Sequence, residues 1–189
     1  MAMKPGERRL QILQMLAAML ENPRSEKVTT AALAARLTVS EAALYRHFAS
    51  KAQMFEGLIE FIETTLFSFI NRITTETTEG VAQAEQTVVM LLSFAEKNPG
   101  MTRVLIGEAL VNEDERLQAR INQLTDKLEA ALRQSLRIAQ AANGWHGDAQ
   151  ADAAVLIAYV LGRWQLFAKS GFKRTPQDGW ALQRKFLFG

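Results

Sequence analysis

Apolar residues recur with helical spacing along nearly the whole chain, and no useful stretch alternates apolar and polar residues with a period of two. The first such stretch carries one apolar face, made of Leu10, Leu13, Leu16, Ala17 and Leu20. This pattern predicts an all-α protein. The expected helices lie near residues 6–21, 29–37, 41–47, 51–76, 80–97, 99–111, 113–142, 148–170 and 176–187.

Proline, glycine and asparagine separate these segments. The strongest breaks are Asn22-Pro23, Asn98-Pro99-Gly100, Asn143-Gly144 and Thr175-Pro176, because such pairs favour turns. The first three helices are short, whereas the later ones are longer. We therefore predict a small N-terminal unit over residues 1–52, joined by the long helix after Ser50 to a larger helical bundle over residues 53–189.

The stretch from Thr29 to Lys51 has the pattern of a helix-turn-helix. Two short apolar faces flank Thr38-Val39-Ser40, and Ser40 is a favourable N-cap for the second helix. Ser50, with Gln53 three residues later, resembles a capping box that starts the next helix. In a helix-turn-helix, the second helix enters the major groove of DNA.

The charge distribution supports contact with DNA at this end. The net charge of the chain is only +2, but residues 1–52 carry eight basic and four acidic residues, so the remainder is net negative. A basic end on a nearly neutral chain suits phosphate contact. Charge alone fits a solvated basic surface equally well, and the helix-turn-helix pattern decides between the two.

These residues resemble the TetR family of DNA-binding regulators. The matching positions are Thr29-Thr30, the run that ends in Ser40, the L-Y-R-H-F of residues 44–48 and Ser50-Lys51. The resemblance implies a homodimer, formed through the last two helices, that reads a palindromic site in double-stranded DNA. Thr38 stands where the family usually has glycine. If that position requires a positive φ, a β-branched residue there is strained.

The start of the second helix supplies the candidate base contacts, Ser40, Glu41, Ala42 and Ala43. Either alanine can touch a thymine methyl group, and Glu41 can accept a hydrogen bond from cytosine N4. Thr29 and Thr30, at a helix N-terminus, can donate to phosphate. The resemblance adds Tyr45, His47 and Lys51 as backbone contacts. The alternatives are core packing for Tyr45 and a plain surface position for His47.

The larger domain resembles one branch of the family in particular. The similar runs are L-I-E-F-I-E-x-x-L at residues 58–66, N-P-G-x-T-R-x-L at 98–105 and D-x-R-L-Q-x-R-I-N-Q-L at 114–124. Members of this branch bind chromosomal sites and, when bound to DNA, antagonise polymers of the division protein FtsZ through its C-terminal tail. The resemblance implies the same activity here, nucleoid occlusion, in a cytoplasmic protein associated with the nucleoid.

A groove between two helices is the predicted site for that tail. Its candidate lining residues have helical spacing: Phe61, Thr65, Phe69 and Arg72 on the long helix, and Met90, Phe94, Lys97 and Asn98 on and after the next helix. Apolar residues with a basic rim suit an acidic, partly apolar peptide. The alternative is that the three phenylalanines belong to the core, as aromatic residues at helical spacing usually do.

Two further stripes concern the bundle. Small residues share one side of the helix near 148–170, namely Ala151, Ala154, Ala158 and Gly162, and permit close approach of a partner helix. Trp164, Phe167, Phe172 and Trp180 are candidates to complete that dimer contact. A leucine-rich stripe is predicted as bundle core, with a basic DNA-facing helix as the weaker option: Leu117, Ile121, Leu124, Leu128, Leu132 and Leu136.

Composition narrows the remaining functions. Without cysteine there are no disulfides, thiolate catalysis or zinc fingers. Neither His47 nor His146 has a catalytic or metal-ligand spacing, so we expect neither an enzyme nor a cofactor. The acidic run Glu113-Asp114-Glu115 is predicted as a solvated helix start.

Two expectations concern membranes and ligands. The first apolar segment is predicted as an amphipathic helix rather than a signal peptide, and the apolar run 153–162 is too short to cross a bilayer. The competing function is a TetR-type repressor released by a small-molecule effector held in an apolar pocket of the bundle. An effector is not expected here.

Overall fold

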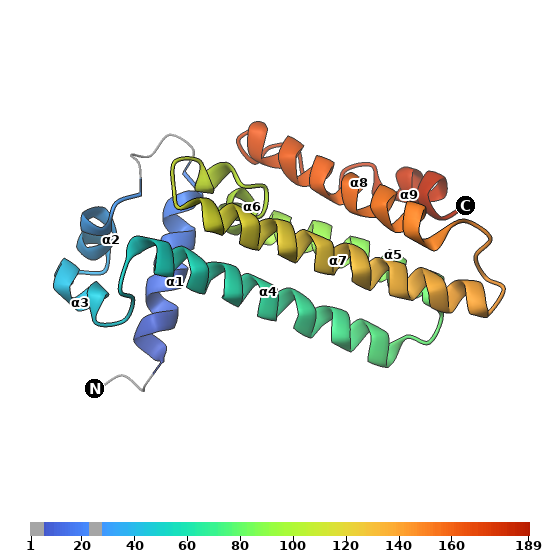
Figure 1. The fold of residues 1–189 in the computed structure, drawn as a ribbon. Helices are drawn as coiled ribbons and strands as arrows, with labels where there is room; N and C mark the ends of the chain where they lie inside the picture. The colour runs from blue at the N-terminus through green and yellow to red at the C-terminus, as the bar shows by residue number, and fades with distance from the viewer. Residues whose placement is uncertain (1–5, 23–27) are drawn as a thin grey trace. The chain divides into compact units, whose positions relative to one another are not determined.

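A computed structural model describes residues 6–22 and 28–189. Within these residues the chain forms nine α-helices and one 3₁₀ helix, with no strand, which confirms the predicted all-α fold (Figure 1). The helices are α1 (Glu7–Leu20), α2 (Thr30–Arg36), α3 (Glu41–Tyr45), α4 (Lys51–Glu76), α5 (Gly80–Lys97), α6 (Pro99–Leu105), η1 (Glu108–Leu110), α7 (Glu115–Ala141), α8 (Ala149–Lys169) and α9 (Trp180–Phe188).

The chain forms two compact units. The first contains the described residues up to 62 together with residues 98–121, and the second contains residues 63–97 and 122–189. The long helices α4 and α7 are each divided between the two units. The predicted boundary between residues 52 and 53 separates the helix-turn-helix from the rest of the chain. It stays a prediction.

In the first unit, α1 packs against α2 and α6. Gly100 makes the approach of α6 possible, because a Cβ atom there would lie 2.0 Å from the carbonyl oxygen of Ala17. The guanidinium of Arg103 donates to the carbonyl of Leu20 at 3.0 Å and so satisfies the C-terminal end of α1. These contacts fix the helix on which the helix-turn-helix rests.

In the second unit, α5 packs against α8. The indole N–H of buried Trp164 donates to the carbonyl of Leu91 at 3.1 Å, so the ring fills the core without leaving a donor unpaired. Gly80 lies so close to α7 that a Cβ atom there would be 2.3 Å from the carbonyl oxygen of Ser135. The predicted leucine-rich stripe is buried along the whole of α7, which confirms it as core.

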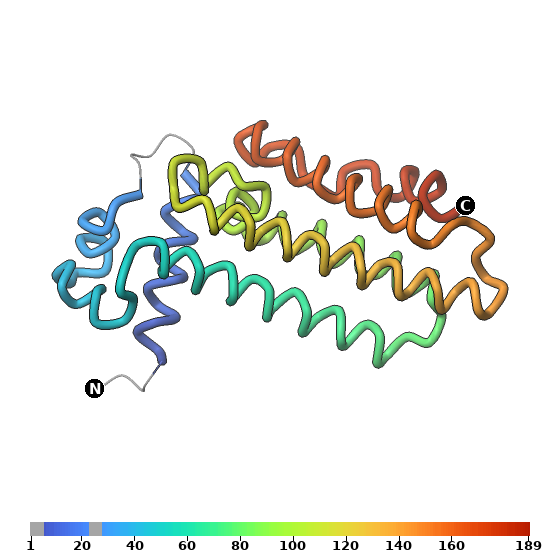
Figure 2. The backbone as a smooth tube through the Cα atoms, in the orientation of Figure 1, coloured from blue at the N-terminus to red at the C-terminus, as the bar shows by residue number. Residues whose placement is uncertain are grey.

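Two predicted helix boundaries were wrong. The segment 99–111 is not one helix, because α6 ends at Leu105 and Gly107 adopts a φ of 77° before η1 begins. The segment 176–187 begins later, at Trp180, after Gly179 with a φ of 78° (Figure 2). The side chain of Arg163 donates to the carbonyls of Thr175, Pro176 and Asp178, which stabilises a non-helical approach to α9.

Helix α8 is, in the described part of the chain, the only helix long and apolar enough for a membrane span by length and composition alone. Its buried residues include Trp164 and Phe167, and it packs on α5. The core of the second unit therefore accounts for its apolar character.

Candidate nucleic-acid interface and partner groove

Hydroxyl caps start both helices of the helix-turn-helix, and the cap at Ser40 confirms the prediction. The Oγ1 of Thr29 accepts from the backbone N–H of Ala32 at 3.1 Å at the start of α2. The Oγ of Ser40 accepts from the N–H of Ala43 at 3.3 Å at the start of α3. Leu33 and Leu44 are buried and hold the two short helices against the first unit's core. Each cap satisfies a backbone N–H in the first turn of the helix that it starts.

The turn between the helices forces Thr38 into the left-handed region, with a φ of 56°. The N–H of Val39 bonds the carbonyl of Ala34 at 3.0 Å, and the N–H of Thr38 bonds that of Ala35 at 3.1 Å. These two bonds define a Schellman motif, in which the left-handed position is usually glycine. The sequence predicted strain at Thr38 if this position required a positive φ. The backbone does adopt a positive φ there, so the condition is fulfilled.

The predicted base contacts lie on an open surface. Ser40, Glu41 and Ala42 are exposed and Ala43 is half-buried. Tyr45 is 44% exposed, so it is not a core residue, and His47 is exposed too. The guanidinium of Arg9, which the sequence pattern did not single out, donates to the carbonyl of His47 at 3.0 Å and lies 4.1 Å from the ring centre of Phe48. Arg9 thereby fixes the chain just after α3.

Thr30 and Glu41 bond each other across the two helices. The hydroxyl of Thr30 donates to the Glu41 carboxylate at 2.5 Å. The single hydroxyl proton of Thr30 is therefore engaged in the free protein, and the carboxylate is held in one direction. Their proposed contacts, with phosphate and with cytosine, remain predictions.

Lys51 has an unexpected partner in the same unit. Its ammonium lies 2.5 Å from the Glu113 carboxylate, and the two side chains are only 24% and 14% exposed. The prediction of a solvated Glu113 was wrong, because tertiary packing brings it to the first turn of α4. Asp114 instead serves the start of α7, where its carboxylate accepts from the N–H of Arg116 at 3.1 Å.

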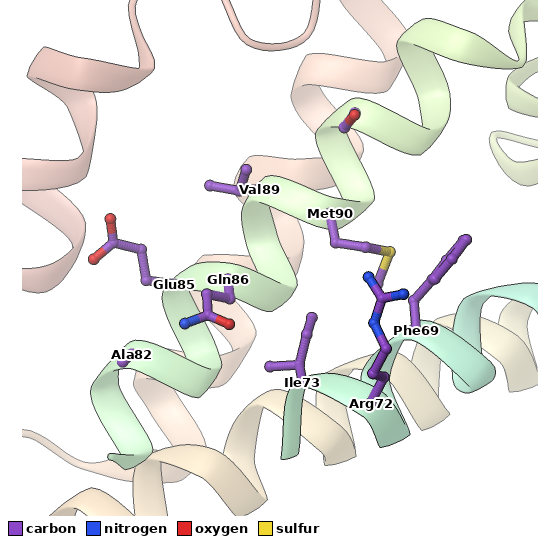
Figure 3. A pocket seen from close by; sticks show the side chains of 9 residues that line it. Phe69, Arg72, Ile73, Ala82, Glu85, Gln86, Val89 and Met90 are labelled. Carbon is purple, nitrogen blue, oxygen red and sulfur yellow. The ribbon is translucent and has the colours of Figure 1, made fainter. Parts of the chain in front are cut away.

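A groove of about 520 Å³ lies between α4 and α5 in the second unit (Figure 3). None of its lining residues is buried, so it is open to solvent. The lining consists of Phe69, Arg72, Ile73, Ala82, Glu85, Gln86, Val89, Met90 and Ser93.

Three of the predicted groove residues, Phe69, Arg72 and Met90, line this groove. Thr65 is half-buried one turn earlier on α4, and Lys97 is exposed at the end of α5. Phe94 is only 7% exposed, as the core alternative expected. Phe61 and Asn98 belong to the first unit. The four-residue spacing of Ala82, Gln86 and Met90, and of Glu85, Val89 and Ser93, could have identified the rest of α5's contribution.

The groove combines an apolar floor with a few charges. Figure 3 shows Arg72 and Met90 pointing toward one another from α4 and α5, and the Arg72 guanidinium lies 6.0 Å from the ring centre of Phe69. The Glu85 side chain points away from these residues in the same view. Its carboxylate is bound by Arg184 of α9, with N–O distances of 2.6 and 2.8 Å. The groove thus offers a cation beside apolar and aromatic surface.

Helices α8 and α9 both carry exposed apolar residues. The predicted small residues Ala151, Ala154, Ala158 and Gly162 are all exposed. Val155 on α8 is 56% exposed, and Leu182 and Phe186 on α9 are 69% and 90% exposed. Large exposed apolar side chains on two consecutive helices are consistent with the predicted protein contact there.

Two of the four aromatic residues predicted to complete this contact belong to the chain's own core. Trp164 and Phe167 are 1% and 2% exposed, so that part of the prediction was wrong, and Phe172 packs on Phe167 with ring centres 5.1 Å apart. Trp180 lies 6.0 Å from Tyr159. The Tyr159 hydroxyl donates to Gln183 at 2.6 Å, and burial raises the pKa of Tyr159 against the opposing charge of Arg163.

Comparisons of fold and motif define the class of protein. A family model described as bacterial regulatory proteins of the tetR family matches residues 25–58, and one described as a tetracyclin repressor-like C-terminal domain matches residues 78–189. The fatty acid degradation regulator FadR of Bacillus halodurans shares the fold, with a TM-score of 0.82 and 14% identity over 99% of this chain and 97% of that one. FadR of Bacillus subtilis, solved with stearoyl-CoA, has a TM-score of 0.78 and 12% identity over 95% of this chain and 97% of that one.

Closer relatives narrow the family. The chain is 50% identical to the nucleoid occlusion factor SlmA of Vibrio cholerae, over 95% of both chains. It is 49% identical to SlmA of Alteromonas mediterranea, over 94% of this chain and 92% of that one. It is also 49% identical to SlmA of a Marinomonas species, over 97% and 94%. The chain therefore belongs to the SlmA nucleoid occlusion factors, within the TetR family of DNA-binding proteins.

Proposed function

We propose that this protein binds palindromic chromosomal sites as a homodimer and, when bound, antagonises FtsZ polymers by holding the FtsZ C-terminal tail in the α4–α5 groove. It acts in the cytoplasm at the nucleoid, without catalysis or a cofactor. The open groove between α4 and α5, with Arg72 beside an apolar floor, is the observation that supports this proposal most directly.

The DNA-binding part rests on the first unit. Exposed residues at the start of α3 form a compact reading surface, and Tyr45 and His47 extend it toward the phosphate backbone. Two copies related by a two-fold axis present two such helices, so the preferred site is palindromic. Few of these side chains make bidentate base contacts, so much of the affinity comes from phosphate contacts and depends on salt.

The groove fits a short extended or helical peptide better than a small effector. A held ligand of drug size is usually buried over most of its surface, whereas every residue that lines this groove is partly exposed. An acidic segment with apolar side chains can place its apolar groups on Phe69, Ile73 and Met90 and its carboxylates near Arg72. Lys97 does not line the groove but is exposed at the end of α5, one turn after the lining residue Ser93, and we propose that it extends the positive rim.

The proposal predicts that charge reversal at the rim separates the two activities. The double variant Arg72→Glu/Lys97→Glu should bind cognate DNA, selected from random sequence, as tightly as the unchanged protein. It should lose most of its effect on FtsZ polymers, because a negative rim repels an acidic tail. The paired measurement is fluorescence anisotropy with DNA and sedimentation of FtsZ polymers in that DNA's presence.

A matched control carries the same charge change elsewhere. Arg137→Glu/Lys173→Glu reverses one arginine and one lysine, both exposed and outside the groove lining, and should keep both activities. If the groove variant still disassembles FtsZ polymers as the control does, the tail does not bind between α4 and α5.

A further inference from the structure

The acidic residue of the groove is bound by a cation from the last helix. Glu85 is the one carboxylic acid among the nine lining residues, and Arg72 is the one cation. Arg184 of α9 binds Glu85 with two N–O contacts, of 2.6 Å to Oε1 and 2.8 Å to Oε2. This two-point geometry holds the carboxylate in a fixed direction as well as compensating its charge.

The direction of Glu85 matters for what the groove accepts. In Figure 3 its carboxylate points away from Phe69, Arg72 and Met90. Its side chain remains 23% exposed, so without a partner it is free to rotate toward the solvent-filled groove. A carboxylate there would compete for Arg72 and repel any acidic ligand.

We propose that Arg184 is a specificity-determining residue of the groove: by binding Glu85 it turns the groove's acid away and keeps the site selective for an acidic peptide. This inference rests on the proposed function of the groove as the site for an acidic tail. Arg184 does not line the groove itself, so it acts through Glu85.

The arrangement also makes the groove depend on the docking of α9. No residue of α9 is buried within the chain, and the helix is held by side-chain contacts such as the Tyr159–Gln183 hydrogen bond and the Arg184–Glu85 pair. A helix attached in this way controls the charge of the neighbouring groove without contacting the ligand.

Four variants test the inference through affinity for a fluorescein-labelled peptide with the sequence of the cell's own FtsZ C-terminal tail. Arg184→Ala should weaken peptide binding by roughly three- to tenfold, as loss of charge complementarity at a rim does. Glu85→Gln should bind at least as tightly as the unchanged protein. Arg184→Ala/Glu85→Gln should recover the affinity of Glu85→Gln, because the acid that Arg184 compensates is gone. Lys185→Ala removes a neighbouring exposed cation of α9 and should change little.

The affinity of the double variant distinguishes an electrostatic role of Arg184 from a role in holding α9 in place. If Arg184→Ala weakens binding and Glu85→Gln does not restore it, Arg184 acts by holding α9 in place, and the inference is wrong. An unchanged affinity in Arg184→Ala also overturns it. If the unchanged protein fails to bind the peptide while Arg184→Ala behaves likewise, the proposed function of the groove fails, and the inference fails with it.

Discussion

Two features of single residues bear on the helix-turn-helix: backbone strain at Thr38 and an ion pair at Lys51. The strain at Thr38 arises because the Schellman motif that ends α2 requires a positive φ and the residue there is β-branched. A non-glycine residue in this region costs on the order of 1 kcal/mol or more. The chain forms the turn despite this cost because buried Leu33 and Leu44 fix the two helices that it joins.

Replacing Thr38 with glycine should therefore stabilise the protein by about 1 kcal/mol, since glycine adopts this φ without a steric penalty while losing more chain entropy. Urea unfolding at equilibrium measures the change. Thr38→Ala removes the β-branch but keeps a Cβ atom, so it should gain less. A glycine variant no more stable than the unchanged protein would show that the turn is not strained.

We propose that Glu113 competes with DNA for Lys51, because the two side chains form an ion pair in the free protein. If Lys51 contacts phosphate, as the family resemblance implies, the ammonium must leave or share its partner. Glu113→Gln should then tighten DNA binding several-fold and increase the salt dependence by up to about one phosphate contact. It should also cost some stability, because a half-buried ammonium loses its counter-charge.

The measurement is DNA affinity at a series of salt concentrations. Glu115→Gln removes the same charge from an exposed position two residues away and controls for general electrostatics. In a Lys51→Ala background, Glu113→Gln should have no further effect. If it tightens binding there as strongly, Glu113 acts on DNA without Lys51.

At the scale of elements, the exposed apolar residues of α8 and α9 are the predicted interface between two copies of the chain. They include small residues on α8 and large residues on α9. The most exposed of the large ones is Phe186, at 90%. This side chain contributes little to the fold of one chain, so an interface between two copies gives it a role. The family resemblance points to the same two helices.

We expect Ala158→Arg to disrupt the dimer, because it places a charge where two helices approach closely. Phe186→Ala should weaken the dimer without unfolding the chain. Analytical ultracentrifugation over a range of concentrations measures both effects, with Ala141→Arg, an exposed alanine at the end of α7, as the control. Dimers that survive both changes would place the interface elsewhere.

The ends of the elements show how far local sequence rules reach. Ser40 and the Ser50–Gln53 pair start their helices as predicted, and the N–H of Gln53 donates to the Ser50 hydroxyl at 3.1 Å. The side chain of Gln53 reaches back to the N–H of Ala49 at 2.9 Å. These caps act over a few residues, so they are readable from the sequence. The start of α9 is not, because it depends on Arg163 from another helix.

At the scale of the whole molecule, the two candidate surfaces belong to different compact units. The described residues of the helix-turn-helix lie in the first unit, and every residue that lines the groove lies in the second. Surfaces that share no side chain are expected to respond independently to substitution.

A variant that changes only the DNA-binding surface tests whether the two surfaces act independently. Ala42→Phe puts a bulky ring on the exposed start of α3 and should abolish preference for the cognate site. It should leave the affinity for the FtsZ tail peptide unchanged, since the groove is untouched. Anisotropy with DNA and with the peptide gives both values. A variant that loses both would show that the units are coupled.

The sequence by itself determined the features that depend on neighbouring residues. Periodicity gave the all-α class, hydroxyl caps gave the helix-turn-helix, and the leucine spacing gave the core face of α7. The position of Thr38 was also readable, because the turn motif fixes its φ. In each case the cause lies within a few residues along the chain.

Only the tertiary structure decided which charged and aromatic residues meet. Lys51 and Glu113 lie 62 positions apart, and Glu85 and Arg184 lie 99 apart, so no local pattern links them. The same holds for the aromatic residues, since Trp164 and Phe94 are buried while Phe69 and Phe186 are exposed. Helical spacing places a side chain on a face, but the packing of other helices determines whether that face is core, groove or interface.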